Sequence, residues 1–177
     1  MKKLLLRALL WAPFVILSAH PAAGQLLPLG PPEHVSASTG AFEVRKTLDE
    51  YETGWELRFA PRRLSLLPGW APDLIPVAGA MATSRGALLA YGGFRFDYPL
   101  GRRWVLSPGW AATLYYRGES KDLGGALEFR SHVELAYRLP GDARVGLCLY
   151  HLSNAGLSGF NPGSESLVFT YSARLRK

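Results

Sequence analysis

Apolar and polar residues alternate along most of this chain, and the alternation is clearest over residues 126–139. One parity of that segment carries Leu127, Phe129, Val133, Leu135, Tyr137 and Leu139, with Ser131 as its one polar member, while the other carries Glu128, Arg130, His132, Glu134 and Arg138. Because successive side chains of a β-strand point to opposite faces, the pattern predicts a strand with one apolar and one charged face. Residues 51–60, 87–98 and 103–117 repeat it.

The alternation and the turn signals between its stretches predict eight strands. They cover residues 34–45, 50–60, 73–83, 87–98, 103–117, 126–139, 143–153 and 165–175. Eight is the smallest usual number for a closed outer-membrane barrel. The predicted fold class is therefore all-β, an eight-stranded antiparallel transmembrane β-barrel of the outer membrane. The segment from Pro61 to Pro72 is longer than the tight turn expected between the second and third strands.

A soluble β-sandwich or lipocalin-like barrel would show the same alternation, with its apolar face inward and its charged face outward. Two observations favour the membrane barrel. The predicted strands have 10 to 15 residues, against ~5–6 in soluble sheets. Aromatic residues also lie near strand ends, as interfacial girdles require. These residues are Tyr51, Tyr98, Trp104, Tyr116 and Tyr137. Periodicity alone leaves the soluble alternative open.

The first 24 residues have the pattern of a secretory signal peptide. Lys2 and Lys3 precede an apolar stretch that runs to about residue 19 with Arg7 as its one interruption, and small residues occupy positions 22–24. Cleavage after Gly24 would leave residues 25–177 as a single barrel domain. The expected location is the outer membrane of a Gram-negative bacterium. The rest of the chain has no run of about 18 apolar residues, the length that a transmembrane helix needs.

Charge and cysteine content exclude some function classes. The 177 residues include 20 Lys and Arg against 14 Asp and Glu, a formal charge of +6. Without the three basic residues of the leader, 17 basic residues face 14 acidic ones, which is a poor signature for nucleic-acid binding. Cys148 is the one cysteine, so no intramolecular disulfide can stabilise the exported chain. We expect its thiol to be buried and inert.

Three chemically active residues fall on the apolar parity of the last two predicted strands. They are His151 and Ser153 in residues 143–153 and Glu165 in residues 165–175. Ionisable groups beside hydrocarbon are unfavourable without partners, so we expect them to cluster near the outer leaflet. Residues two apart in a strand share a face about 6.5 Å apart. A base can then activate the serine while the carboxylate orients the base. Ordinary polar residues at a strand end remain the alternative interpretation.

The segment His151-Leu152-Ser153-Asn154-Ala155-Gly156, followed by Asn161-Pro162-Gly163-Ser164-Glu165, resembles the PagL-type lipid A 3-O-deacylases. The resemblance covers roughly residues 127–171. It implies an outer-membrane barrel whose outward-facing Ser-His-Glu triad removes the ester-linked 3-hydroxyacyl chain at the 3-position of lipid A.

The same resemblance assigns the site residues. Ser153 would be the nucleophile, His151 the general base and acid, and Glu165 the orienting carboxylate. Asn154 would stabilise the oxyanion with backbone N–H groups such as that of Ala155 or Gly156. The resemblance implies no metal or cofactor. The substrate would be lipid A, in lipopolysaccharide and within outer-membrane lipid.

Other functions stay open at this point. An outer-membrane phospholipase or acyl transferase could use the same Ser-His chemistry, and a non-catalytic structural barrel would need none of it. A homodimer is neither favoured nor excluded. Arg85, Arg117 and Lys121 could approach lipid phosphates near the outer rim, or could simply be solvated in loops. His132 falls on the charged parity, where a hydrogen-bonded packing role is expected.

Overall fold

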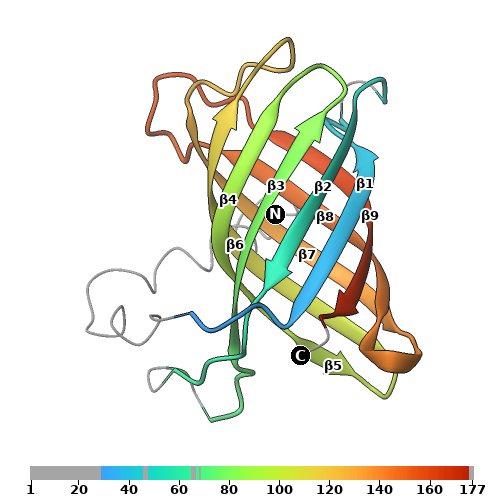
Figure 1. Ribbon diagram of the computed structural model, residues 1–177. Coiled ribbons are helices and arrows are strands. Elements are labelled where there is room, and N and C mark those ends of the chain that lie inside the picture. Colours follow the sequence, from blue (N-terminus) through green and yellow to red (C-terminus); the bar gives the residue numbers. More distant parts are fainter. Residues whose placement is uncertain (1–28, 46–47, 65–66, 68, 176–177) are drawn as a thin grey trace, which may run out of the picture.

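The computed structural model describes residues 29–45, 48–64, 67 and 69–175, and these residues form a closed antiparallel β-barrel (Figure 1). The segment expected to be a signal peptide, residues 1–24, lies outside the described residues. No helix within the described ranges is long and apolar enough to cross a membrane.

Eight long strands and one short strand make the sheet. They are β1 (His34–Ala41), β2 (Tyr51–Arg58), β3 (Leu74–Thr83), β4 (Leu88–Phe96), β5 (Tyr98–Leu100), β6 (Trp104–Tyr116), β7 (Leu127–Arg138), β8 (Arg144–Ser153) and β9 (Ser164–Arg174). Each of the eight long strands pairs with the next long strand in the chain, β4 with β6 included, and pairing of β1 with β9 closes the barrel. β5 follows β4 along the same edge of β6 and pairs with the first residues of that strand. A single 3₁₀ turn, η3 (Pro140–Asp142), joins β7 to β8.

The prediction of eight strands is confirmed, with most strand ends within two residues of the expected positions. The exception is the first strand, which was expected to reach residue 45 and ends at Ala41. The chain bends after Ala41, and Glu43 has a φ of 58°, which is incompatible with a strand. The short β5 and the η3 turn were not predicted.

The charged parity faces the barrel interior. In β7, Glu128, Arg130, His132 and Glu134 are all buried, while Val133 and Leu135 are 39% and 43% exposed on the outside. The other strands repeat this division, as in β2, where Glu52 and Glu56 are buried and Trp55 is half exposed. A soluble barrel would place its apolar face inward, so the arrangement decides for a transmembrane barrel.

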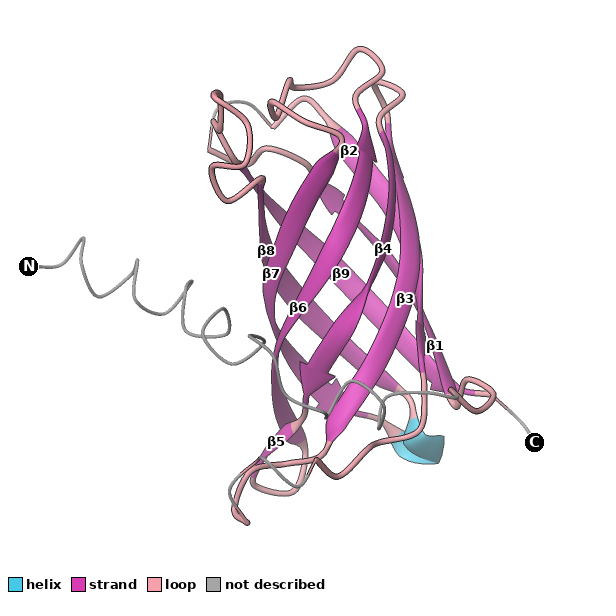
Figure 2. Ribbon diagram, turned by 90° about the vertical axis from the view of Figure 1, so that its left-hand side faces the viewer, coloured by secondary structure: helices cyan, strands magenta, loops and turns pink. Residues whose placement is uncertain are grey.

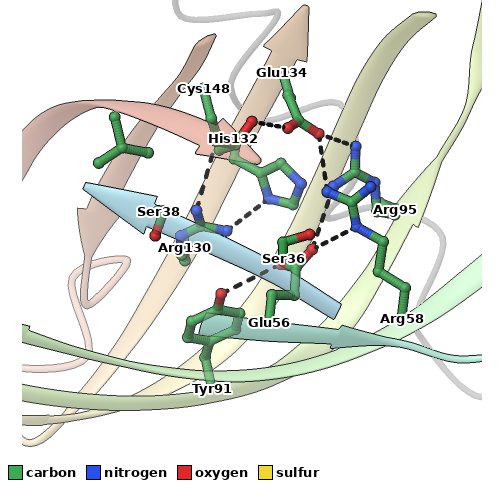
Figure 3. A pocket seen from close by; sticks show the side chains of 12 residues that line it. Ser36, Ser38, Glu56, Arg58, Tyr91, Arg95, Arg130, His132, Glu134 and Cys148 are labelled. Carbon is green, nitrogen blue, oxygen red and sulfur yellow. Dashed lines mark hydrogen bonds and ion pairs between the residues drawn. The ribbon is translucent and has the colours of Figure 1, made fainter. Parts of the chain in front are cut away.

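Charged and aromatic side chains fill the lumen (Figure 3). Arg95 and Arg58 both contact Glu56 and Glu134 in a buried network. Arg130 lies between the rings of Tyr91 and Tyr150, with its guanidinium carbon 4.9 and 4.4 Å from their centroids. A cavity of about 20 Å³ remains among these side chains. The lumen is therefore a packed polar core at this level. His132 has the hydrogen-bonded packing role expected for it, since its Nδ1 lies 3.1 Å from Arg130.

The two ends of the barrel differ. One end carries the connections β1–β2, β3–β4, β6–β7 and β8–β9, which rise above the strands (Figures 1 and 2). The other end carries both ends of the described chain and the long β2–β3 connection. A bridge between Arg62 and Leu74 prolongs the pairing of β2 with β3, which accounts in part for the unexpected length of that connection.

Candidate active site

The register of β8 and β9 places His151 directly opposite Glu165. Both side chains lie on the outward face of the barrel, near the end that carries the four loops. His151 Nδ1 is 3.1 Å from Glu165 Oε1, and the two side chains are 26% and 21% exposed. When Nδ1 carries the proton and donates it to the carboxylate, Nε2 is the basic ring atom. The pair therefore has the geometry of an oriented general base.

Glu165 is also held from the loop after β1. The Val44 N–H donates to the Glu165 carbonyl at 2.8 Å, and the Arg45 guanidinium forms an ion pair with Oε2 of Glu165. One carboxylate oxygen thus faces the imidazole and the other faces a cation. These contacts fix the carboxylate in position.

Ser153 lies two residues beyond His151 on the same outward face, at the end of β8. Across the β7–β8 pairing, its neighbour is Phe129. No hydrogen bond joins Ser153 to the imidazole within the described chain. Catalytic hydrogen bonds of this kind are often long in ligand-free enzymes and tighten when substrate binds.

A second hydroxyl lies beside the histidine. Ser131 of β7 is the direct cross-strand neighbour of His151 and also faces outward. Its position as the one polar residue on the apolar parity of residues 127–139 was a visible signal, but no role was assigned to it. Any assignment of the nucleophile must therefore separate Ser153 from Ser131.

Asn154 does not lie where the expected side-chain role requires. The side chain is buried on the face opposite that of Ser153, and its amide nitrogen donates to the carbonyls of Leu123 and Phe160, both at 2.9 Å, and to Ser158 Oγ at 2.7 Å. Its Oδ1 accepts from the Gly156 N–H at 3.0 Å. The Asn154 side chain therefore braces the β8–β9 loop and is not a free donor for an oxyanion.

The backbone of the same turn offers a different donor. The Asn154 N–H donates to Asn161 Oδ1, and the Gly156 N–H is also occupied. The N–H of Ala155 has no hydrogen-bond partner within the described residues. Ala155 has a φ of 55°, a conformation that non-glycine residues rarely adopt. Of the two backbone donors expected near the serine, Ala155 is the available one.

Gly163 packs against the imidazole. A Cβ at this position would lie 2.7 Å from His151 Cε1 and 3.3 Å from Nε2, and the residue has a φ of +61°. Both the close approach and the positive φ require glycine. The glycine two residues before Glu165 thus forms one wall around the basic edge of the histidine.

The three rim cations are all paired. Arg85 binds Asp49 at 2.5 Å and Arg117 binds Asp122 at 3.0 Å, both pairs being largely exposed. Lys121 is 14% exposed, and its ammonium binds Glu43 and the Gly163 carbonyl. The Lys121 ammonium is therefore bound within the loops, and contact of these cations with lipid phosphates stays a prediction. Within the described ranges, no group of three or more His, Cys, Asp or Glu side chains could hold a metal ion.

Comparison with known proteins identifies the family. The family model described as "Lipid A 3-O-deacylase (PagL)" matches residues 47–174. The chain belongs to this family. The resemblance inferred from the segments around His151 and Glu165 is thereby confirmed, and the chain is an outer-membrane β-barrel of the PagL family.

One PagL relative agrees with this membership. The chain is 33% identical over 78 residues to the lipid A deacylase PagL of Bordetella bronchiseptica. The match covers 43% of this chain and 44% of that relative, so the chain spans less than half the length of the curated relative it matches.

A solved structure shares the barrel fold. The crystal structure of the outer membrane enzyme PagL is similar over 80% of this chain and 99% of its own, with a TM-score of 0.62 and 20% identity. A de novo designed transmembrane β-barrel matches 84% of this chain and 100% of its own, with a TM-score of 0.47 and 11% identity. The PagL-family fold of the chain thus agrees with a solved structure of that fold.

Proposed function

We propose that this protein is a serine esterase that removes the ester-linked 3-hydroxyacyl chain at the 3-position of lipid A. One observation carries the proposal: His151 is hydrogen-bonded to Glu165, beside Ser153, on the membrane-facing side of the barrel. A soluble substrate would bind in a cleft or in the lumen. A lipid ester reaches the protein from the membrane, at the outer face where these three residues lie. Membership of the lipid A 3-O-deacylase family supports lipid A as the substrate.

In the first half of the proposed reaction, Ser153 Oγ attacks the carbonyl carbon of the ester while His151 Nε2 takes the hydroxyl proton. The Glu165 carboxylate stabilises the resulting imidazolium. The Ala155 N–H donates to the oxyanion of the tetrahedral intermediate. When the intermediate collapses, the bond from the carbonyl carbon to the sugar oxygen breaks, and the imidazolium returns its proton to that oxygen.

In the second half, water replaces the sugar hydroxyl. His151 Nε2 takes a proton from the water, whose oxygen attacks the acyl-enzyme carbonyl carbon. The second tetrahedral intermediate collapses with cleavage of the bond to Ser153 Oγ, which recovers its proton from the imidazolium. A 3-hydroxy fatty acid leaves, and the enzyme returns to its starting state.

The test is mass spectrometry of lipid A after incubation with the purified barrel in detergent micelles, with glycerophospholipid as a parallel substrate. We expect lipid A to lose the mass of one 3-hydroxyacyl chain and the phospholipid to remain intact. Cleavage of phospholipid alone would replace the proposal with a phospholipase. A folded barrel that cleaves neither ester would contradict enzymatic function, since detergent removes any barrier that an intact membrane places before the substrate.

A row of aromatic rings on the outer face begins beside Ser153 and crosses β7, β6 and β4. Phe129, opposite Ser153, stacks on Trp110 of β6 with ring centroids 5.4 Å apart and an interplanar angle of 20°. Trp110 in turn lies 6.1 Å from Phe94 of β4. The scissile acyl chain is proposed to lie along this row. Because the chain is already in hydrocarbon, the row orients it by packing contact and not by removing it from water.

Phe129→Ala tests this placement of the acyl chain. We expect kcat/KM for lipid A to fall about fivefold, which corresponds to ~1 kcal/mol of lost contact with the reacting chain. The matched control is Phe169→Ala, which removes an outward phenylalanine of β9 that is not part of the row. Equal kinetic effects of the two substitutions would remove the row from the substrate site.

A further inference from the structure

Three loops at the site-bearing end meet at one lysine. Lys121, from the β6–β7 loop, donates from Nζ to a Glu43 carboxylate oxygen in the β1–β2 loop and to the Gly163 carbonyl in the β8–β9 loop, at 2.5 Å for the latter. Figure 1 shows all three loops at the same end of the barrel. The three residues are called the Lys121 bridge below.

The Lys121 bridge is a buried and constrained contact. The side chains of Lys121 and Glu43 are 14% and 7% exposed, so loss of either would leave the other charge desolvated without its counter-charge. The Tyr115 hydroxyl donates to the Lys121 carbonyl at 2.8 Å and so fixes the backbone of the lysine. Glu43 has a positive φ of 58°, a strained conformation that persists only where surrounding contacts impose it.

The contact leads directly to the catalytic histidine. Gly163, whose carbonyl accepts from Lys121, is the residue that packs against Cε1 and Nε2 of His151. Two residues later, Glu165 receives the hydrogen bond from His151 Nδ1, and its carbonyl accepts from Val44, the residue after Glu43. The bridge thus holds both segments that surround the imidazole.

We propose that Lys121 is a positioning residue: through Glu43 and the Gly163 carbonyl it fixes the wall of the site that keeps the His151 imidazole directed from Glu165 toward the serine. This inference rests on the function proposed above for the reaction it serves. The orientation of the imidazole is a property of the folded barrel and can be measured without substrate.

Lys121→Met removes the ammonium and keeps a flexible side chain of similar length. We expect kcat for lipid A to fall 10- to 100-fold, the range that small misplacements of catalytic groups produce, with KM changed less than about twofold. Lys121→Arg keeps the charge and donors and should restore part of the rate. The control for kcat is Arg174→Met, which breaks an exposed pair with Asp142 at the other end of the barrel and should leave kcat unchanged. Arg117→Met, which breaks the exposed pair with Asp122 in the same loop, is the control for the spectra described below.

Folding is checked by heat-modifiable gel mobility, and kcat is expressed per folded barrel. A brace that serves stability alone would lower the yield or the unfolding midpoint of Lys121→Met without changing kcat per folded molecule. That result would overturn the proposal, because kcat would then be the same in the wild type, Lys121→Met and Lys121→Arg.

A second measurement is independent of activity. In protein labelled with ¹⁵N-histidine, correlation of the ring protons with the ring nitrogens reports the tautomer of His151, assigned with a His151→Gln sample. We expect one Nδ1-protonated tautomer in the wild type and in Arg117→Met, and a mixture in Lys121→Met. If the wild type cleaves no lipid A, the proposed function is contradicted, but this spectrum still tests whether the Lys121 bridge orients the His151 imidazole. Identical spectra for Lys121→Met and Arg117→Met would contradict it.

Discussion

Replacing Ser153 with alanine is expected to lower kcat for lipid A deacylation by at least about 10³-fold and to leave the barrel folded. Without the hydroxyl, the His151–Glu165 pair has no protein nucleophile to activate, and only the residual effect of substrate binding and oxyanion stabilisation remains. The side chain lies on the outer face at the end of β8. It makes no hydrogen bond to the imidazole within the described chain, so its removal should not disturb the fold. Release of 3-hydroxy fatty acid, followed by mass spectrometry, measures the loss.

Ser131→Ala is the matched control for this prediction. Ser131 carries the same hydroxyl, faces the same side of the barrel and lies directly opposite His151. We expect its removal to change kcat less than about threefold, because the family segment around His151 contains Ser153 and not Ser131. If Ser131→Ala abolishes cleavage and Ser153→Ala does not, the nucleophile is on β7 and the order of attack proposed above is wrong.

The strands and their faces could be predicted because a strand repeats every two residues and this chain keeps that repeat over long stretches. Residues 126–139 are an example: the parity that carries Glu128 and Glu134 is the buried one, and the prediction was within one residue of β7 at both ends. What parity could not decide was which face is inside. The burial of Glu128 and Glu134 in the folded barrel decides it, because both a soluble and a membrane barrel are closed sheets.

The site divides in the same way. β8 and β9 follow each other in the chain, so sequence could place His151 and Glu165 on neighbouring strands, and the register in the structure adds that they lie directly opposite each other. The roles of Asn154 and Lys121 depend on contacts between loops far apart in the chain. Asn154 reaches Leu123, and Lys121 reaches both Glu43 and Gly163. No local pattern encodes such contacts, so the sequence could not predict the bracing contacts of either residue.

The lumen explains how a barrel with so much internal charge is stable. Arg95 is 2% exposed, and its guanidinium contacts three carboxylates, those of Glu56, Asp97 and Glu134. Arg58 and Arg144 supply two further cations to the same carboxylates. Three negative and three positive groups therefore balance within the described network, and Figure 3 shows most of them in one layer of the interior.

Arg95→Met is expected to lower the free energy of unfolding by about 3–5 kcal/mol, because it leaves Glu56, Asp97 and Glu134 buried with one cation fewer. Chemical denaturation in detergent or lipid, followed by tryptophan fluorescence, measures the change. The control is Arg102→Met, at an exposed position of the β5–β6 turn, which should shift the unfolding midpoint very little. Adding Glu134→Gln to Arg95→Met should recover part of the loss, since the unpaired carboxylate is then removed as well.

The free energy of unfolding at low pH provides a second test of Arg95→Met. Burial alone would raise the pKa of Asp97, between β4 and β5, but the Arg95 and Arg144 guanidinium groups outweigh burial and lower it to about 2. The unfolded-state value is about 3.9, so the stability that Asp97 contributes is present above about pH 4 and is lost as the pH falls to about 2. Without Arg95 the folded-state pKa of Asp97 rises, so the contribution above pH 4 shrinks. Arg95→Met should therefore show a smaller loss of stability between pH 4 and 2 than the wild type. An unchanged acid profile, together with unchanged stability at neutral pH, would mean that packing in the lumen, and not this charge network, holds the barrel interior together.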